Sequence, residues 1–329
     1  MSRDTGCFTQ PAQTGDDIRI FRYDPDRDRN AWDDFVGKAK NSHFMFFRNY
    51  MDYHSDRFRD HSLLFYRGDK LLAILPASEH GEELRSHGGL TYGGFLCGES
   101  MKQSRMMECF RLLRGYLSDC GFSRMIYKCI PHIYHRIPAE EDRYALFRSS
   151  AKIMKIEPAT VVPMKNELKM PKGRKAQISR ARREGVVCRQ SEDFERFFEL
   201  ENEVLESRHQ VRAVHTAAEM RLLHSRFTRN IELHLAMRNE ELLAGVLLFI
   251  TEKTVHTQYM ASAGAGREIG ALDFLVATLI ERFRAEKEFF DFGISSESGG
   301  QILNEGLIYQ KEGFGGRTVA YETWELTGK

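Results

Sequence analysis

The positions of apolar residues predict two successive runs of strands and helices. In the first half, alternation of apolar and polar residues at Ile18–Tyr23 predicts a strand, and apolar residues three or four apart predict helices. The predicted β-α-α-β-β-(β)-α-β order comprises a strand at 18–23, helices at 25–39, 41–58 and about 102–120, a hairpin at 66–76 and a strand at 123–131. Interleaved strands and helices indicate an α/β fold on a mixed sheet.

The second half repeats this order. Its predicted elements are a strand at 185–190, helices at 191–209 and 217–227, three consecutive strands within 231–262, a glycine-rich loop at 262–271, a helix at 270–287, a strand at 289–295, a helix around 302–310 and a strand at 317–326. Ser191 is the expected N-cap of the first helix. Phe194 stands three residues later, so no capping box is expected there.

A short hairpin sequence occurs in both halves. An offset of 171 residues sets Arg238 on Arg67 and aligns the leucines and alanine that follow. Each copy has a polar turn between two apolar runs, which is a hairpin pattern. We therefore predict an α/β protein with two tandem domains of the same kind, at 18–170 and 185–329, joined by a basic linker helix at 171–184 and preceded by a disordered leader at 1–17.

Charge and composition narrow the class of protein. Lysine and arginine number 48 and the acids 47, so the net charge of +1 draws neither nucleic acid nor anionic membrane to the whole molecule. The longest apolar run, Leu242–Ile250, is too short for a bilayer, which takes about 20 residues. The polar start has no secretion signal, so we expect a cytoplasmic protein. The cysteines show no ligand spacing, and no metal site is predicted.

A basic segment lies between the halves. Lys172–Arg183 holds six basic residues before the first acid, Glu184, and Gly185 suits a helix C-terminus. One interpretation is a solvated linker helix. The other is a contact with phosphate or an RNA backbone, which would make transfer RNA a candidate partner.

The closing residues resemble a known family. A strand ending in Asp-Phe-Gly precedes a helix with a lysine and an aromatic-glycine pair, at Asp291, Phe292, Gly293, Lys311, Phe314 and Gly315. This resembles the C-terminal signature of FemAB-like tandem GNAT acyltransferases. "SHGGLTYGGF" and "VHTQYMAS" are similar to a bacterial GNAT-type branch linked to surface polysaccharide and cell-envelope synthesis. The long helical-hairpin insertion that some Fem ligases use with transfer RNA is not found in the sequence.

The resemblance implies two tandem GNAT folds, with the donor site in the second. In such a fold two neighbouring strands diverge and the donor enters the gap; here the strands would be 255–262 and 289–295. The implied co-substrate is acetyl-CoA or another acyl-CoA, with no permanently bound cofactor. Backbone amides of the loop after the first strand would hold its pyrophosphate. The residues concerned are Gly264, Gly266, Arg267 and Gly270, although such glycines also serve any strand-to-helix turn.

Four residues are candidates for the chemistry. Lys311 matches the family lysine implied to balance charge as the acyl group moves, and a solvated surface lysine is the alternative. Glu297 could take the amine's proton or cap the next helix. His256 is a second candidate base. Alternation puts His256 and Gln258 on one face of their strand and Tyr259 on the other.

Candidates for binding the acceptor lie in both halves. Arg208 and His215 fall in the segment that covers the acceptor side of a GNAT fold, where they would bind an anionic acceptor or stay solvated. In the first half, polar and aromatic side chains on loops suit a sugar-nucleotide or glycan, or else brace those loops. These are His87, Tyr92, Lys128 and Tyr134.

The expected function is an acyltransferase that moves an acetyl or other acyl group from coenzyme A to an amine of a sugar-nucleotide, lipid-linked sugar or other cell-envelope precursor. The first alternative is Fem-type aminoacyl transfer from charged transfer RNA to a peptidoglycan precursor, which the basic segment keeps open. The second is a non-catalytic module that binds glycan or nucleotide. The near-neutral net charge favours the small donor over RNA.

Overall fold

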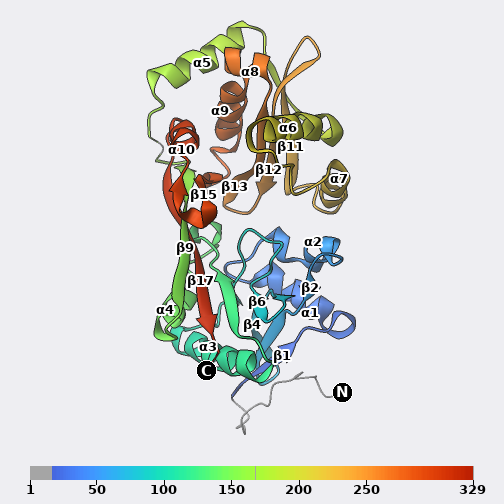
Figure 1. Ribbon diagram of the computed structural model, residues 1–329, viewed down its shortest axis with the longest axis vertical. Coiled ribbons are helices and arrows are strands. Elements are labelled where there is room, and N and C mark those ends of the chain that lie inside the picture. The colour runs from blue at the N-terminus through green and yellow to red at the C-terminus, as the bar shows by residue number, and fades with distance from the viewer. Residues whose placement is uncertain (1–16, 167, 329) are drawn as a thin grey trace. The chain divides into compact units, whose positions relative to one another are not determined.

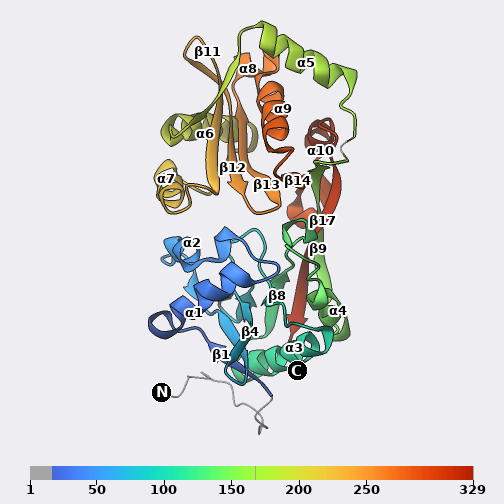
Figure 2. The same cartoon turned by 180° about the vertical axis from the view of Figure 1, so that it is seen from behind.

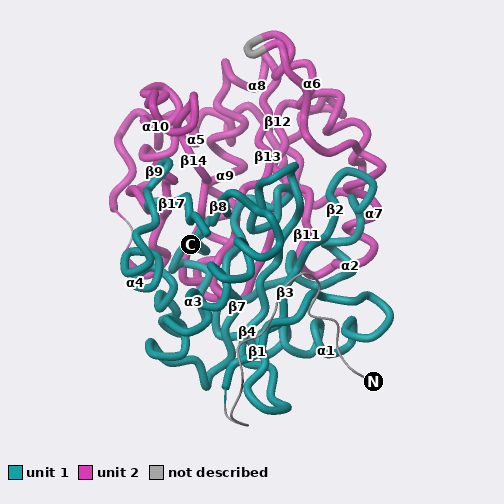
Figure 3. Tube along the Cα trace, turned by 60° about the horizontal axis from the view of Figure 1, so that its bottom comes forward, with its two compact units in different colours: residues 1–157, 320–329 teal, residues 158–319 magenta. Residues whose placement is uncertain are grey.

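The computed structural model describes residues 17–166 and 168–328, apart from the side chains of Arg208 and His209. All but the last residue of the leader expected at 1–17 lies outside the described residues. The chain forms two compact units (Figures 1 and 3). Unit 1 is Met1–Glu157 with Ala320–Lys329, and unit 2 is Pro158–Val319.

The chain passes between the units inside two strands. It leaves unit 1 within β9 (Lys152–Pro163) and returns within β17 (Arg317–Thr327). The sequence-based boundaries fall at 170 and 185, in the loop before α5 (Lys172–Arg183) and just after it. This helix belongs to unit 2. Strand pairing decides where the last ten residues belong, and no local pattern encodes that.

Unit 1 has two sheets around one core. One sheet has the order β1-β3-β4-β7 and the other the order β17-β8-β6-β5-β2. Helix α3 supplies residues to the core at three- and four-residue intervals, including Met106, Cys109, Phe110 and Leu113. The elements are β1 (Ile18–Arg22), α1 (Pro25–Lys38), η1 (Phe44–Phe46), α2 (Arg48–Met51), η2 (Asp52–His54), β2 (Arg59–Asp60), β3 (Leu63–Arg67), β4 (Lys70–Leu75), β5 (Ser78–His80), β6 (Glu83–Arg85), β7 (Leu96–Cys97), α3 (Gln103–Asp119), β8 (Arg124–Lys128), η3 (His132–Tyr134) and α4 (Glu141–Arg148).

Unit 2 has a mixed sheet in the order β10-β11-β12-β13-β14-β9. Helices α9 and α6 cover opposite faces of it (Figures 1 and 2). Leu275 and Leu279 of α9 pack against Val246 and Leu248 on one face, and α6 approaches Gly245 on the other. The remaining elements are β10 (Val187–Ser191), α6 (Phe194–His209), α7 (Ala217–Arg226), β11 (Ile231–Arg238), β12 (Glu241–Ile250), β13 (Thr254–Ser262), α8 (Gly264–Ile269), α9 (Ala271–Phe283), β14 (Phe289–Ile294), β15 (Ser296–Glu297), η4 (Ser298–Gly300), β16 (Ile302–Leu303) and α10 (Glu305–Glu312).

The repeated hairpin is present in both units with the same irregularity. Arg67 pairs with Lys70 and Arg238 with Glu241, at the turns that the sequence predicted. In each hairpin the register shifts one residue pair further on, between Phe65 and Tyr66 in unit 1 and between Ala236 and Met237 in unit 2. The offset of 171 therefore aligns the bulges as well as the turns, which confirms two related domains.

The prediction of a single helix over residues 41–58 is wrong. This segment forms three short pieces, η1, α2 and η2; the extended residue Phe47 separates η1 from α2, and η2 follows α2 directly. Arg48 is fully buried, with its guanidinium 3.4 Å from the ring centroid of Tyr23 and 3.8 Å from that of Trp32. It also pairs with Asp60 at 2.6 Å. Tertiary contacts on all sides of the segment override the helical periodicity.

The cap expected at Ser191 is also wrong. Strand β10 continues through Ser191, which pairs with Leu233, so the helix starts later. Asp193 is the N-cap of α6, and its side chain accepts a hydrogen bond of 3.1 Å from the backbone N–H of Arg196. The choice between cap residues two positions apart was made by strand pairing.

Two findings concern the cysteines and the helices of the described residues. Burial raises the pKa of Cys97, Cys109 and Cys129, which favours the protonated thiol over the reactive thiolate. Within residues 17–166 and 168–328, no helix has the length and apolar character needed to cross a bilayer.

Candidate functional site

Strands β13 and β14 pair over a short distance only. Their parallel pairing runs from Thr254 and Phe289 to His256 and Asp291. On its other side β13 pairs with β12 up to its last residue, and β14 pairs with β9 up to Asp291 and, after a register shift, again at its last residue, Ile294. Each strand follows a different neighbour beyond His256 and Asp291, so the two diverge. A backbone edge of β13 is left facing this gap.

An imidazole–carboxylate pair closes the inner end of the gap. His256 Nδ1 lies 2.8 Å from Asp291 Oδ2, and Asp291 Oδ1 accepts a hydrogen bond of 2.8 Å from the backbone N–H of Gly293. Gly293 has a φ of 69°, and a Cβ there would lie 3.1 Å from His256 Cε1. Glycine suits both the backbone conformation and the close ring. The Asp-Phe-Gly sequence thus fixes the imidazole.

Lys311 ties α10 to the diverging end of β14. Its side chain is only 5% exposed, so it is not the solvated surface lysine of the alternative interpretation. Nζ donates hydrogen bonds to the carbonyl oxygens of Gly293 at 3.1 Å and Ile294 at 2.6 Å. Burial lowers the pKa of Lys311 to about 8, against the opposing effect of the Asp291 charge. The lysine therefore stabilises the strand end that borders the gap.

A pocket of about 280 Å³ opens beside β13. Arg174 forms one wall; it pairs with Asp273, donates from Nη2 to the carbonyl oxygen of Gln310 at 2.7 Å, and lies 4.3 Å over the ring of Phe314. The pocket is lined by Arg174, Val204, Met260, Ser262, Gly266, Arg267, Gly270, Leu272, Asp273, Leu307 and Gln310. Within the described residues, no cluster of His, Cys, Asp or Glu is suited to hold a metal ion.

The glycine-rich segment is a short helix, α8, rather than the open loop expected from its composition. Gly266 and Gly270 permit close packing, since a Cβ on Gly266 would lie 2.1 Å from the carbonyl oxygen of Leu243 and one on Gly270 would lie 2.9 Å from Gln177. Arg267 Nη1 donates to the carbonyl oxygen of Ser262 at 2.7 Å. Gly266, Arg267 and Gly270 line the pocket, and Gly264 is not among its lining residues.

A bulge in β13 overturns the expected alternation of its side chains. His256 pairs with Phe249 of β12, and Tyr259 pairs with Leu247, because the register shifts across Gln258. Phe249 and Leu247 are two residues apart on one strand and share a face, so their partners share it as well. His256 and Tyr259 therefore lie on the same face of the sheet. The expectation of opposite faces is wrong because period-two reasoning cannot count a bulged residue.

This shared face lies under α6. The Tyr259 ring packs edge-on against Phe198 with centroids 5.5 Å apart, and its hydroxyl lies 2.8 Å from Nδ1 of His215. Burial raises the pKa of Tyr259, so the phenol stays protonated at neutral pH. The structure thus brings together Tyr259 and His215, which the sequence assigned to separate roles.

Sequence reasoning missed Glu201, which faces the same region. It follows Phe198 by three residues on α6 and precedes the pocket residue Val204 by three, so the three share one side of the helix. Glu201 is 5% exposed, and burial raises its pKa to about 7. Its charge acts on Tyr259. The signal was readable: a glutamate in the stripe of Phe194, Phe197 and Phe198 occupies a position expected to be apolar.

Of the two remaining candidates in this unit, the structure describes the side chain of Glu297 only. Glu297 is exposed in the β15–β16 hairpin and accepts a hydrogen bond of 2.7 Å from Asn304 Nδ2. Asn304, not Glu297, is the N-cap of α10, since its side chain accepts from the N–H of Leu307. The side chain of Arg208 lies outside the described residues.

The candidates of unit 1 form a buried brace. Lys128 Nζ donates to the carbonyl oxygen of His87 at 2.7 Å and to that of Leu90, and burial lowers its pKa to about 7. The rings of Tyr92 and Tyr134 lie 4.7 Å apart and are almost fully buried. These contacts hold the glycine-containing connection between β6 and β7 in place.

Part of the second unit matches a known family profile. Residues 172–299 match the family profile described as Acetyltransferase (GNAT) domain. Among curated proteins there is no sequence match.

Similar solved structures cover both units. FemX is 12% identical with a TM-score of 0.64, covering 94% of this chain and 97% of its own. The C-terminal domain of a putative lysylphosphatidylglycerol synthetase from Agrobacterium fabrum is 13% identical with a TM-score of 0.61, covering 93% of each chain. A tandem GNAT protein from the clavulanic acid biosynthesis pathway is 10% identical with a TM-score of 0.54, covering 95% and 99%. This chain therefore has the FemAB-like tandem GNAT fold, with an acyltransferase domain of the GNAT type in its second unit.

Proposed function

We propose that the chain transfers an acyl group, acetyl in the simplest case, from coenzyme A to an amine of a sugar or cell-envelope precursor. The observation that carries the proposal is the divergence of β13 from β14 after His256 and Asp291, with a pocket opening along β13. The backbone groups of β13 on this side have lost a strand partner, and buried backbone groups require one. An extended thioester donor lying in the gap would supply it.

The pocket suits the phosphate-bearing part of such a donor. The guanidinium groups of Arg174 and Arg267 line it, and guanidinium is a strong partner for phosphate. The N-terminus of α9 adds backbone N–H groups at the same place. Gly266 and Gly270 let this wall of the pocket pack closely against Leu243 and Gln177. Gly266, Arg267 and Gly270 thus keep the donor-binding role expected from the sequence, in a helical rather than looped form, and Arg174 is added to them, whereas Gly264 is not a lining residue.

The groups around the gap have separable roles in the transfer. As the amine nitrogen attacks the carbonyl carbon, the C–N bond forms and the C–S bond breaks. Tyr259, kept protonated, gives a proton to the leaving thiolate and regains one from the acylated nitrogen. Lys311 places a positive charge beside the last residues of β14 and holds them in place through its hydrogen bonds to their carbonyl oxygens. Of the two candidates expected from the sequence, His256 borders the gap in an orientation fixed by Asp291, whereas Glu297 is exposed, so His256 is the one that can orient the reacting groups.

A second donor has one specific observation in its favour. Lys172, Lys175, Arg180, Arg182 and Arg183 of α5 are all exposed, whereas Arg174 of the same helix is held by Asp273. An exposed row of cations suits a nucleic-acid backbone. Similarity to a putative lysylphosphatidylglycerol synthetase also keeps an aminoacyl donor in view. Aminoacyl transfer from transfer RNA is therefore the runner-up.

Thermal unfolding and filter binding separate the two donors. Coenzyme A at saturating concentration should raise the Tm of the full chain by several degrees, since a ligand of the folded state stabilises it by mass action. A mass-spectrometric screen of acyl-CoA donors against amino-sugar nucleotides should then show a transferred acyl group. Strong salt-dependent binding of transfer RNA without a response to coenzyme A would reverse the order of the two donors.

A further inference from the structure

Glu201 is a buried carboxylate that the mechanism above does not use. It is 5% exposed, and within the described residues its Oε2 has no hydrogen-bond partner. A buried carboxylate oxygen without a donor is unfavourable unless something supplies one. Glu201 stands among aromatic residues on the side of α6 that faces β13, one helical turn before the pocket residue Val204. The missing donor must therefore come from this side of the sheet.

Among the side chains that the structure describes, none supplies a cation that shifts the pKa of Glu201. On β13 the titratable groups of the same face are Tyr259, whose hydroxyl lies 2.8 Å from His215 Nδ1, and His256, which is held by Asp291. Helix α7 faces the other end of α6, where Arg221 pairs with Glu195 and His224 Nε2 lies 3.6 Å from Glu192 Oε1. Burial by itself accounts for the raised pKa of Glu201. The carboxylate is thus placed to receive a positive charge from outside the chain.

We propose that Glu201 binds the ammonium group of the acceptor and takes its first proton, which makes the acceptor a primary amine rather than a hydroxyl compound. This rests on the proposed function for its donor. An ammonium offers both the opposite charge and three N–H donors, whereas a hydroxyl offers one donor and no charge. His256 then has a positioning role, because its link to Asp291 fixes the strand edge against which the acyl group lies.

The proton balance of the transfer fits this assignment. The ammonium gives one proton to the ionised Glu201, which becomes a neutral acid, and the nitrogen lone pair attacks the thioester carbonyl. The C–N bond forms, the C–S bond breaks, and the second nitrogen proton replaces the one that Tyr259 gave to the thiolate. Glu201 then releases its proton to solvent. Amine, thioester and carboxylate need no further co-reactant.

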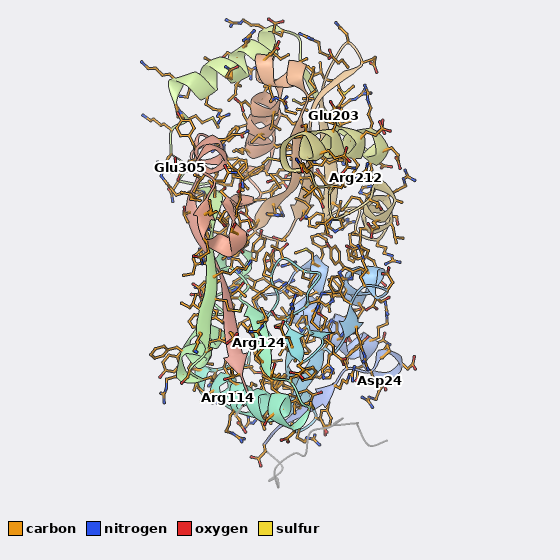
Figure 4. All side chains as sticks on the ribbon, viewed as in Figure 1. Asp24, Arg114, Arg124, Glu203, Arg212 and Glu305 are labelled. Atoms are coloured by element: carbon orange, nitrogen blue, oxygen red, sulfur yellow. The ribbon has the colours of Figure 1, made fainter. Side chains whose placement is uncertain are left out.

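Binding of simple amines tests the proposal without the donor. Thermal unfolding of the full chain would be measured with glucosamine, ethanolamine and lysine, and with the neutral N-acetylglucosamine and ethylene glycol. At least one amine should raise the Tm at pH 8 and not at pH 5.5, and the Glu201→Gln variant should lose this shift. The matched control is Glu203→Gln, an exposed glutamate two residues away on the same helix (Figure 4). Absence of any Glu201-dependent amine shift would overturn the proposal.

Kinetics distinguish a proton acceptor from a structural residue. With acetyl-CoA and the responding amine, Glu201→Gln should lower kcat at least 100-fold and leave the KM for acetyl-CoA within about threefold, since positioned bases contribute roughly 10² to 10⁴ in rate. In Glu201→Gln, kcat should no longer fall as the pH is lowered through the pKa of the carboxylate. The Glu201→Asp variant should restore part of the rate. An unchanged profile in Glu201→Gln, or equal turnover of hydroxyl acceptors, would refute the assignment.

The donor and acceptor assignments can fail separately. Coenzyme A should raise the Tm of wild type and of Glu201→Gln equally, because Glu201 is not among the residues that line the donor pocket. If neither responds, the donor assignment fails, while the amine shift still decides the role of Glu201. If both respond to coenzyme A and no amine shift depends on Glu201, the present proposal alone is refuted.

Discussion

The desolvated carboxylate of Glu201 makes a quantitative prediction about stability. Burial raises its pKa from the ordinary 4.5 to about 7. At about 1.36 kcal/mol for each unit of pKa, this corresponds to about 3 kcal/mol. Below pH 4.5 the group is protonated in both folded and unfolded chains, so its ionisation does not lower the free energy of unfolding. Between pH 4.5 and 7 the unfolded chain loses the proton that the folded chain keeps, so stability falls as pH rises, and the full loss is reached above pH 7.

Replacement by glutamine removes this pH dependence. The amide cannot ionise, so the stability of Glu201→Gln relative to wild type should rise by about 3 kcal/mol between pH 4.5 and 8.5. For a unit the size of Pro158–Val319, this corresponds to roughly 6 to 12 °C in Tm. The difference between the two proteins is the measured quantity, so that acid effects on other groups cancel. A fixed cost of burying the amide shifts the whole curve and does not affect its slope.

The assay is thermal unfolding of the full-length chain at half-unit steps of pH, by circular dichroism and calorimetry, for wild type, Glu201→Gln and Glu203→Gln. The exposed Glu203 should give a variant whose Tm follows wild type at every pH. A gap between wild type and Glu201→Gln that stays constant from pH 5 to 8.5 would refute the reasoning. It would mean that the carboxylate is solvated or paired in solution.

Three further substitutions follow from the geometry around the gap. Lys311→Met removes the hydrogen bonds from a buried ammonium group to two carbonyl oxygens of β14, so urea unfolding should show a loss of about 2–4 kcal/mol and acyl transfer should fall at least tenfold; unchanged values would rule out the bracing role. Gly266→Ala forces a Cβ to within 2.1 Å of the Leu243 carbonyl oxygen, and should cost about 2 kcal/mol or more and weaken coenzyme A binding, measured by calorimetry. Gly264→Ala is its control, because the nearest atom there is 3.9 Å away; equal effects would contradict the packing argument. Asp291→Asn keeps the side-chain shape but takes the negative charge from His256, and should lower kcat about tenfold or more with little change in donor KM; a wild-type pH–rate profile would show that the pair has no part in the reaction.

Local patterns predicted most of the elements because they depend on neighbours in sequence. The hairpins at Tyr66–Pro76 and Met237–Phe249, the three strands after Ile231 and the long helices recur where periodicity placed them. The Asp-Phe-Gly motif with Lys311 also pointed to the correct strand and helix. Periodicity failed where contacts from distant segments outweighed it, as around Arg48, and where one bulged residue, Gln258, reversed the side-chain order.

The sequence by itself determined a duplicated α/β chain, near-neutral in charge, and it predicted that the chemistry lies in the second half. Tertiary structure decided which of the polar residues meet. Asp291 contacts His256, and Tyr259 contacts His215. Glu201, a residue type usually found at the surface, is desolvated because it is buried on the side of α6 that faces β13. The physical reason is that the pKa of a group and its partners depend on the dielectric and the charges around it. Those come from strands and helices far apart in the chain, which no local pattern can place.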